Sequence, residues 1–439
     1  MVTTDSGQAF KGVGDWKHIT LGDIASEPNC LIQTGPFGSQ LHKHEYQDHG
    51  VGVVNPTHLS DNRIAHDDVP HVSSETANRL ERHRLAPGDI LFARRGEIGR
   101  HGLVSEAENG WLCGTGCFLV RIRRKDVDNH FLSFFLATKE TVDWLNRHAA
   151  GVVMPNLSNN VLHRVPIALP PVAEQRKIAG VLGLVQRAME QQDRLIALTT
   201  ELKKALLHQL FTHGLRGAPQ KETEIGTVPE SWDVVRLGDV AKLESGGTPA
   251  RDNPAYWNGG CIPWVKTGEI AYRVIDTTEE MITREGLANS AAKIFPNGTL
   301  LVAMYGQGVT RGRVGLLGID AATNQACAAI TPRDEQKVST RFIYHFLEFH
   351  YEDLRQMGHG ANQRNLNAAL IKGFRLSFPK PDEQAQIVEA LGILNAKLML
   401  HQTKHAALTA LFRTLLHQLM TAQIRVDKLD IEEIVVGIS

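Results

Sequence analysis

Two glycine- and arginine-rich loops are the residues of this sequence best suited to chemistry, and that chemistry is binding. Each follows a short apolar run: residues 94–102 read Arg-Arg-Gly-Glu-Ile-Gly-Arg-His-Gly, and residues 304–313 read Met-Tyr-Gly-Gln-Gly-Val-Thr-Arg-Gly-Arg. Arginine can pair with guanine through two hydrogen bonds or hold a phosphate, glutamine can pair with adenine, and glycines let the backbone come close. A solvated hairpin is the alternative for either loop alone. Two basic loops at matching places favour binding.

A second pair of loops lies near the start of each half of the chain. Residues 33–40 read Gln-Thr-Gly-Pro-Phe-Gly-Ser-Gln, and residues 245–251 read Ser-Gly-Gly-Thr-Pro-Ala-Arg. Their glycines fit either a binding loop or a simple turn. Both interpretations remain open from the sequence.

Catalytic signatures are weaker. Asn253-Pro254-Ala255-Tyr256 is similar to the turn with which amino-methylating DNA methyltransferases hold a flipped adenine, but no strand and glycine loop for S-adenosylmethionine accompanies it. The tetrapeptide also has no counterpart in the first half. Neither a phosphate-binding Gly-x-x-x-x-Gly-Lys-Ser/Thr loop nor a Gly-x-Ser-x-Gly elbow occurs in the sequence. A stand-alone methyltransferase is therefore a disfavoured alternative.

Metal chemistry has little support either. The 20 histidines are spread along the chain, and His42, His44, His49 and His58 lack metal-ligand spacing. Cys113 and Cys117 lie four apart with no second pair, so a zinc site is not expected. We predict that the chain itself holds no metal.

Length, composition and charge bound the class of protein. The 439 residues suggest about two to four domains, and 42% hydrophobic with 22% charged residues is typical of a globular protein. Five scattered cysteines fit a reducing cytoplasm, and we find no signal peptide or apolar run of about 18 residues. A net charge of −1 is unusual for a nucleic-acid binder, so such a role would need local basic patches or basic partner chains.

The chain is an internal duplication. Residues 205–212 (Ala-Leu-Leu-His-Gln-Leu-Phe-Thr) recur as residues 414–421 (Thr-Leu-Leu-His-Gln-Leu-Met-Thr), at an offset of 209. Further matches have similar offsets: Pro170, Glu174 and Gln175 with Pro379, Glu383 and Gln384; Asn156-Leu157 with Asn365-Leu366; residues 87–93 with 297–303; and Trp16 and Leu21-Gly22-Asp23 with Trp232 and Leu237-Gly238-Asp239. A repeat this long indicates two copies of a whole domain.

Each half divides into a mixed first part and a helical second part. Residues 16–165 and 232–375 contain short β-rich runs separated by turn signals, and each includes one helical stretch, near 129–147 and 339–356. The clearest expected strands are Ile90–Ala93, Cys117–Val120 and Leu300–Ala303. We predict two α/β (α+β) domains with irregular sheets.

The second parts, residues 172–213 and 381–421, have the spacing of long helices. Alternating steps of four and three from Ile387 meet apolar residues at eight of ten positions, and the same steps from Ile178 meet seven of ten. Such a narrow seam is typical of a coiled coil, and Gln192 and His401 make both seams polar at the same repeat position. Helices of about 40 residues are about 60 Å long. We predict an antiparallel intramolecular pair related by a pseudo-twofold axis; the alternative is that each helix packs on its own domain or on a partner chain.

These patterns divide the chain into six segments. They are a first domain (1–168), a first helical spacer (169–214), a connector (215–231), a second domain (232–379), a second spacer (380–422) and a tail (423–439). Within the tail, the apolar residues 434–438 are expected to dock as a strand.

With both halves laid out, the chain resembles the specificity (S) subunit of type I restriction–modification systems. The resemblance rests on the paired Trp and Leu-Gly-Asp at the start of each half, the connector residues 226–232, the loops at 35–41 and 245–249, Lys266-Thr267-Gly268-Glu269-Ile270, and Pro-x-x-x-Glu-Gln at the start of each long helix. It spans nearly the whole chain. It implies a non-catalytic subunit in which two target-recognition domains each read one half of a split DNA site.

The resemblance also implies partners and an asymmetric target. In that family the two helical regions space the domains and dock two methyltransferase subunits, while endonuclease/translocase subunits complete the restriction enzyme. S-adenosylmethionine, ATP and Mg are then expected on the partners and not on this chain. The helices would set a fixed distance between the domains, so the two half-sites should lie roughly 34 Å apart, about one helical turn of DNA. The first domain is longer than the second between shared landmarks (23 to 88, against 239 to 298), so the two half-sites should differ in sequence.

Two sets of residues are predicted to carry these functions. The expected DNA contacts are Gln33, Ser39, Gln40, Lys43, Arg94, Arg95, Arg100, Thr248, Arg251, Lys266, Tyr305, Gln307, Thr310, Arg311 and Arg313. The expected coiled-coil and partner-docking residues are Ile178, Leu182, Val185, Leu206, Ile387, Leu391, Leu398 and Leu415. A non-enzymatic coiled-coil scaffold with two protein-binding domains is the alternative from another class.

Overall fold

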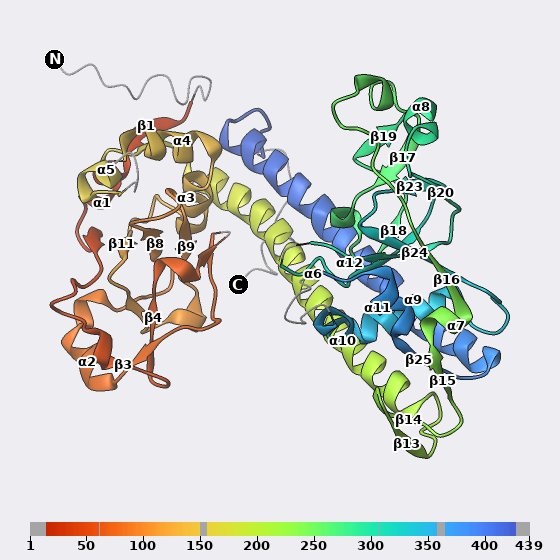
Figure 1. Cartoon of the computed structure of the whole chain (residues 1–439). Coiled ribbons are helices and arrows are strands. Elements are labelled where there is room, and N and C mark those ends of the chain that lie inside the picture. Colours follow the sequence, from red (N-terminus) through yellow and green to blue (C-terminus); the bar gives the residue numbers. More distant parts are fainter. Residues whose placement is uncertain (1–14, 61, 150–155, 307, 358–364, 427–439) are drawn as a thin grey trace. The chain divides into compact units, whose positions relative to one another are not determined.

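Each half of the chain forms a mixed sheet-and-helix domain that is followed by one long helix (Figure 1). The computed structural model describes residues 15–60, 62–149, 156–306, 308–357 and 365–426. By packing, the chain separates into two units: the first joins residues 1–193 to 403–439, and the second comprises residues 194–402. Each unit therefore contains one domain and parts of both long helices.

The first domain is organised around a four-stranded sheet with the order β2-β11-β8-β9. Its strands are β2 (Leu31–Thr34), β11 (Cys117–Arg121), β8 (Ile90–Ala93) and β9 (His101–Leu103). A second sheet has the order β10-β4-β7-β3, and two shorter ladders pair β1 with β12 and β5 with β6. These strands are β10 (Leu112–Cys113), β4 (Val51–Val54), β7 (His71–Val72), β3 (Tyr46–Gln47), β1 (Lys17–Thr20), β12 (Pro166–Leu169), β5 (Leu59–Ser60) and β6 (Arg63–Ile64).

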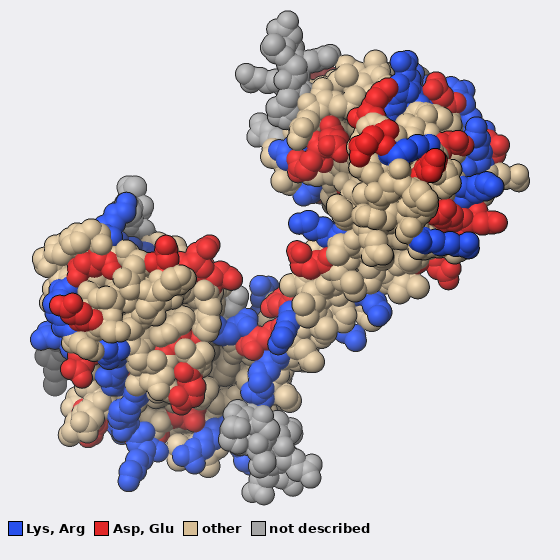
Figure 2. Space-filling model, turned by 90° about the horizontal axis from the view of Figure 1, so that it is seen from below, with Lys and Arg blue, Asp and Glu red and all other residues tan. Residues whose placement is uncertain are grey.

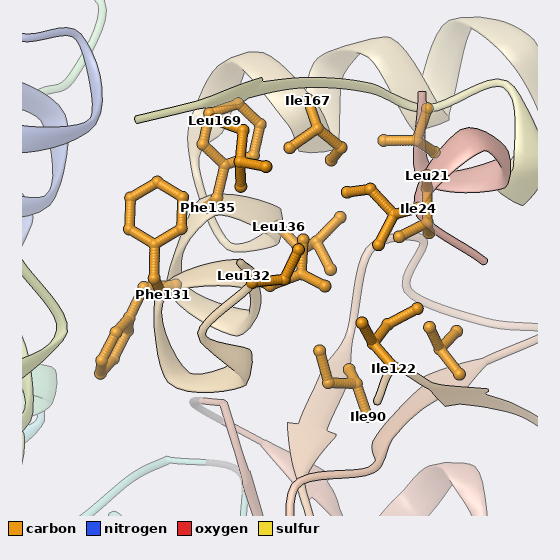
Figure 3. Close-up of a cluster of buried hydrophobic side chains, with 14 of the residues drawn as sticks. Leu21, Ile24, Ile90, Ile122, Phe131, Leu132, Phe135, Leu136, Ile167 and Leu169 are labelled. Carbon is orange, nitrogen blue, oxygen red and sulfur yellow. The ribbon is translucent and has the colours of Figure 1, made fainter. Parts of the chain in front are cut away.

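Short helices pack on both sheets and help to close the apolar cores of this domain. They are α1 (Leu21–Ala25), α2 (Ser74–Arg79), α3 (Asn129–Leu136), α4 (Lys139–His148) and α5 (Asn159–His163). Figure 3 shows part of this core, where Phe131 and Phe135 of α3 lie among apolar side chains of α1, β8 and β12. The long helix α6 (Val172–His213) adds Ile178 and Leu182 to the same core.

The second domain repeats this frame with additions. Its main sheet has the order β16-β24-β21-β22-β18, in which the first four strands correspond to β2-β11-β8-β9. The strands of the second domain and its connector are β13 (Gln220–Thr223), β14 (Gly226–Pro229), β15 (Asp233–Arg236), β16 (Ala241–Ser245), β17 (Ile262–Val265), β18 (Val274–Ile275), β19 (Glu280–Ile282), β20 (Ile294–Phe295), β21 (Leu300–Ala303), β22 (Val314–Leu317), β23 (Ala321–Thr323), β24 (Cys327–Pro332) and β25 (Arg375–Phe378). The helices are α7 (Leu237–Val240), α8 (Arg284–Ala288), α9 (Thr340–Phe349), α10 (Tyr351–Gln356), α11 (Ala368–Gly373) and α12 (Pro381–Met420).

The repeated sequence landmarks have the same structural roles in both domains. Trp16 packs edge-on against Phe131 with ring centroids 6.0 Å apart, and Trp232 packs against Phe342 at 5.9 Å. The glycine of each Leu-Gly-Asp lets two helices approach, because a Cβ on Gly22 would lie 2.8 Å from the carbonyl oxygen of His163 in α5. The duplication inferred from the sequence is therefore a duplication of packing as well.

The expected helical stretches near 129–147 and 339–356 are wrong in one respect, because each is two short helices. In the first domain α3 ends at Leu136 and α4 begins at Lys139. Thr138 separates them: its hydroxyl bonds the carbonyl of Phe135 and accepts from the N–H of Thr141, which caps α4. Side-chain capping of this kind competes with continuing a helix.

A buried glutamine fixes the start of each long helix to its domain. The amide of Gln175 accepts from the N–H of Asp128 at 2.8 Å and donates to the carbonyls of Asp126 (2.9 Å) and Pro170 (2.8 Å). The amide of Gln384 makes the equivalent bonds to Ser339, Lys337 and Pro379. The Gln of Pro-x-x-x-Glu-Gln thus joins the long helix, the end of the preceding strand and the loop before α3 or α9.

Contacts within each unit show that the two long helices run antiparallel. In the first unit Glu174, near the start of α6, forms an ion pair with Arg425, just after α12 (3.2 Å), and Asp193, further along α6, forms one with His405 inside α12 (3.1 Å). Later residues of α6 therefore pair with earlier residues of α12. In the second unit the N–H of Leu215, just after α6, donates to Glu383 near the start of α12 at 3.1 Å. The prediction of an antiparallel pair is confirmed.

The long helices also pack on the domains. Pairing of the two helices with each other and packing of each helix on its own domain therefore occur together and are not alternatives. The end of α6 supplies Leu207, Leu210 and Phe211 to the core of the second domain, while the end of α12 supplies Leu419 and Met420 to the core of the first. Each domain therefore packs against the start of its own helix and the end of the other. The expected strand at residues 434–438 lies outside the described residues.

Candidate nucleic-acid interface

The two glycine- and arginine-rich loops connect equivalent strands and are held by equivalent backbone bonds. The first joins β8 to β9 and the second joins β21 to β22. At the start of the loops, the N–H of Arg94 donates to Gly116 and that of Met304 donates to Ala326, both at 2.8 Å. At their ends, the N–H of Ala93 donates to Arg100 and that of Ala303 donates to Arg313.

The Asn-Leu segments found as repeats in the sequence brace these loops. The N–H of Leu157 donates to the carbonyl of Arg94 at 3.0 Å, and that of Leu366 donates to Met304 at 3.1 Å. Between the shared bonds the loops differ, because residues 94–99 span the first and residues 304–312 span the second. The same frame thus carries loops that differ by three residues.

The first loop presents arginines that form few bonds within the chain. Arg95 is exposed and Arg94 is half-buried, with its guanidinium 5.9 Å from the ring centre of Phe118. The Nε atoms of Arg94 and Arg100 are buried and have no hydrogen-bond partner among the described residues. Arg100 lies 3.8 Å from the exposed carboxylate of Glu97. No described acid forms an ion pair with Arg94 or Arg95, so their charge is available to a ligand.

The second loop is braced by helix α10 and presents a different set of side chains. The hydroxyl of Tyr351 donates to the carbonyl of Val309 (2.6 Å), and the guanidinium of Arg355 donates to that of Gly308 (2.7 Å). Tyr305 is exposed, while Thr310, Arg311 and Arg313 are half-buried. Gln307 lies outside the described residues.

The glycines of the leading loops are required by close backbone packing. A Cβ on Gly35 would lie 2.0 Å from the carbonyl oxygen of Gly114, and one on Gly246 would lie 2.0 Å from that of Thr323. These glycines are therefore structural. Gly38, in contrast, has open space around it, beside the exposed Phe37 and Ser39.

Several other predicted contact residues bond within the chain. The amide of Gln33 donates to Arg82, that of Gln40 accepts from the N–H of Phe37, and Thr248 donates to Gln325. Lys43 is exposed at the start of a short 3-10 helix (Lys43–Glu45). The leading loops are thus largely self-bonded, with Phe37, Ser39 and Lys43 facing solvent.

Two predicted cations are paired with acids of strand β19 and the residue before it. Arg251 forms an ion pair with Glu280 and stacks on Trp257, with 3.9 Å from its guanidinium carbon to the ring centre. Lys266 pairs with Glu279 at 2.8 Å and with Glu280 at 2.9 Å, and hydrogen bonds to these carboxylates raise the pKa of its ammonium group. Their charge is locally neutralised, which makes them weaker candidates than the loop arginines.

The surface charge is mixed. Figure 2 shows Lys and Arg interspersed with Asp and Glu on the face in view, as expected for a net charge of −1. Binding to a polyanion would therefore depend on local groups such as the 94–100 loop.

Sequence reasoning missed Phe37 and the brace residues Tyr351 and Arg355. Phe37 is 55% exposed, in the same loop as the predicted contact residues Ser39 and Gln40. The signal for Phe37 was present in the Gly-Pro-Phe-Gly sequence, whereas the contacts of Tyr351 and Arg355 with residues more than 40 positions away had none.

The catalytic alternatives gain no support from local geometry. Asn253 caps a short 3-10 helix (Pro254–Tyr256) by accepting from the N–H of Ala255, as an ordinary turn residue does. Among the described residues there is no group of three or more His, Cys, Asp or Glu side chains able to hold a metal ion. Burial raises the pKa of the Cys117 thiol to about 12. In the described part of the chain no helix is long and apolar enough to cross a membrane.

This architecture defines a class of protein: two copies of one recognition frame with different loops. The family model described as the type I restriction modification DNA specificity domain matches residues 14–208 and 229–410. The chain therefore belongs to the family of type I restriction–modification specificity subunits.

Individual proteins similar to this chain are also described as type I specificity (S) subunits. The chain is 22% identical over 421 residues to the putative type I restriction enzyme MjaX specificity subunit of Methanocaldococcus jannaschii, covering 94% of each chain. A crystal structure of the type I restriction–modification S subunit from M. genitalium matches with a TM-score of 0.62 at 15% identity, over 92% of this chain and 96% of that one. A structure titled for complex assembly and conformational transition of the type I R-M system matches with a TM-score of 0.51 at 18% identity, over 94% and 100%. These likenesses establish the shared fold.

Proposed function

We propose that each domain reads one half of a split, asymmetric DNA sequence through its glycine- and arginine-rich loop. The observation that carries this proposal is that equivalent strands and equivalent backbone bonds hold loops of different length and sequence. A duplicated frame with divergent loops is the arrangement expected when two related sites must recognise different bases. Arginine side chains without internal ion pairs, as at Arg94 and Arg95, suit guanine edges or phosphates.

We further propose that the long helices dock two methyltransferase subunits. The predicted docking residues Ile178, Leu182, Val185, Ile387 and Leu391 are buried within the chain, and Leu206, Leu398 and Leu415 are half-buried. Docking must therefore use other helix residues.

Exposed leucine and isoleucine side chains at equivalent positions supply such a surface. Leu184 and Leu411 are 46% exposed in the first unit, and Leu202 and Ile393 are 57% and 54% exposed in the second. Leu184 and Ile393 correspond at the offset of 209, as do Leu202 and Leu411. Each pair lies beside the seam on the same flank of an antiparallel pair of helices. One equivalent apolar pair in each unit supports two equivalent docking sites.

The chemistry then belongs to the partners. Methyltransferase subunits would bind S-adenosylmethionine, and endonuclease/translocase subunits would use ATP and Mg, while this chain supplies sequence recognition. The structural relative whose title names assembly of the type I R-M system supports a role within a multisubunit complex.

Arginine substitutions test the reading of bases. With methyltransferase subunits present, Arg94→Ala should weaken binding to the cognate site by about 1–3 kcal/mol and relax specificity in one half of it only. Arg311→Ala should do the same in the other half. Binding titrations against single-base variants of the site measure both effects.

The control is Arg216→Ala, an exposed arginine of the connector, which should leave specificity unchanged. If Arg94→Ala lowered affinity equally for every DNA sequence, Arg94 would be a phosphate contact and not a base reader.

Substitutions at the exposed leucines test docking. Leu202→Asp and Leu411→Asp should each remove one of two methyltransferase sites, and the double variant should remove both, because a buried leucine contributes about 1.5–3 kcal/mol and the new carboxylate is costly to bury. Native mass spectrometry of the complexes gives the stoichiometry. Exposed neighbours supply matched controls in Glu201→Ala and Arg413→Ala. Two subunits bound with unchanged affinity in the double variant would refute this surface.

A further inference from the structure

A buried group of charged and polar side chains joins α6 to the second domain. The ammonium of Lys203 lies 2.5 Å from one carboxylate oxygen of Glu348, and Nδ1 of His345 lies 3.2 Å from the other. All three side chains are at most 10% exposed. Lys203 comes from α6 and the other two come from α9, 145 positions away in sequence. We call these three residues the polar triad.

The polar triad is costly to bury, and its partners satisfy one another. Burial acts to raise the pKa of the Glu348 carboxyl, but His345 and Lys203 more than offset this, so the pKa is lowered. A buried ion pair is often no more stable than apolar side chains of similar volume, whereas leaving one charge of it unpaired is strongly destabilising. The stability of such a group therefore depends strongly on whether each charge meets its correct partner.

The equivalent place in the first unit is apolar. Phe412 takes the position of Lys203 at the offset of 209, and Phe134 and Ala137 take the positions of His345 and Glu348 at an offset of 211. The rings of Phe412 and Phe134 pack edge to face, with centroids 5.9 Å apart. The same contact between a helix end and a domain is thus charged in one unit and aromatic in the other.

The neighbouring residues of the two helix ends are more alike and carry no comparable change of charge, although Phe211, which packs against aromatic rings of the second domain, corresponds to Met420. Residues 205–212 and 414–421 share the sequence Leu-Leu-His-Gln-Leu, and both ends pack apolar side chains into a domain core. The shared Leu-Leu-His-Gln-Leu residues alone would let the end of α6 pack on the first domain of another copy, with Phe211 in place of Met420. Such a wrong pairing would bury Lys203 against Phe134 and Ala137, or Glu348 against Phe412.

We propose that the polar triad determines which helix end each domain accepts. The second domain accepts the α6 end that carries Lys203, the first accepts the α12 end that carries Phe412, and pairing between two like halves of different chains is rejected. The rejection works by leaving a buried charge unpaired, which is how proteins commonly select against a wrong partner. This inference goes beyond the proposed function and does not depend on DNA reading.

Exchange between cut chains tests it. A protease site is inserted after Gly217, whose surroundings are open, and the full chain is folded before it is cut. The cut gives a first piece, up to Gly217, and a second piece, which contains the rest of the chain. Two preparations, with different tags on both pieces, are then mixed in urea. The urea concentration is chosen so that first pieces of one preparation pair fully with second pieces of the other. That exchange is the internal control for dissociation. Pull-down on each tag then counts like pairs (two first pieces or two second pieces) and unlike pairs.

The wild-type chain should give almost only unlike pairs. The variant Lys203→Phe with His345→Phe and Glu348→Ala copies the aromatic contact into the second unit and should raise like pairs to about half of the total, the share expected without selection. The reverse variant, Phe412→Lys with Phe134→His and Ala137→Glu, places the polar triad in both units and should have the same effect even where the first variant does not fold.

Two results would overturn the proposal. One is a wild-type chain that forms like pairs as readily as unlike pairs. The other is that either folded variant retains the wild-type preference, which would mean that other differences between the halves set the pairing.

Discussion

Replacing residues 241–332 with the corresponding segment of another family member is expected to change one half of the methylated DNA site and leave the other half unchanged. The segment runs from β16 to β24 and contains the loop 304–313. It leaves Trp232, α9 and the hydrogen bonds of Gln384 in place, so the packing of the domain on the helices is retained.

The effect should be large because recognition energies accumulate over base pairs. Each mismatched base pair costs about 1–3 kcal/mol, roughly additively, so a new half-site should abolish modification of the original sequence. Sequencing methylated DNA from cells that express the chimaera with its partner subunits reads both halves at once. The matched exchange of residues 31–121, from β2 to β11, should change only the other half. If either exchange altered both halves or neither, two independent readers would be excluded.

Gln384→Ala should destabilise the chain by about 2–5 kcal/mol, and Gln175→Ala should do nearly the same. Each substitution leaves an N–H and two carbonyls without their partner in a place where the glutamine is at most 2% exposed. Each buried group left unsatisfied costs about 1–3 kcal/mol, and the small cavity adds to that.

Denaturant unfolding followed by circular dichroism measures this loss. The matched control is Gln386→Ala, which removes an exposed glutamine two residues further along α12 and should change stability by less than about 0.5 kcal/mol. If the Gln384→Ala chain were as stable as the Gln386→Ala chain, water would replace the hydrogen bonds of Gln384 without loss of stability.

Periodic and repeated features could be predicted from the sequence. The helices expected at 172–213 and 381–421 are observed as Val172–His213 and Pro381–Met420, and the strand expected at Leu300–Ala303 has those bounds. These features depend on local spacing and on turn residues, which a single sequence displays.

Contacts between distant segments could not be predicted. Nothing near Lys266 or Arg251 in sequence shows that Glu279 and Glu280 will neutralise them, because this depends on how β19 pairs with β17. In the sequence, Lys203 is only a polar residue at a seam position, and its partner Glu348 becomes apparent in the folded structure. For the candidate site, the loops were identified by composition, but which of their arginines keep a free charge depends on these tertiary contacts. The DNA contacts themselves stay predictions.

The packing of Leu419 and Met420 in the core of the first domain has a consequence for synthesis on the ribosome. A domain at the start of a chain usually folds while the rest is still being made. Here the first core cannot close until its last side chains emerge, more than 200 residues after residue 193. At about 5–20 residues per second this is a delay on the order of 10–50 s. For that time the nascent first domain lacks the α12 side chains that complete its core, so its packing is completed only after the second domain has been made.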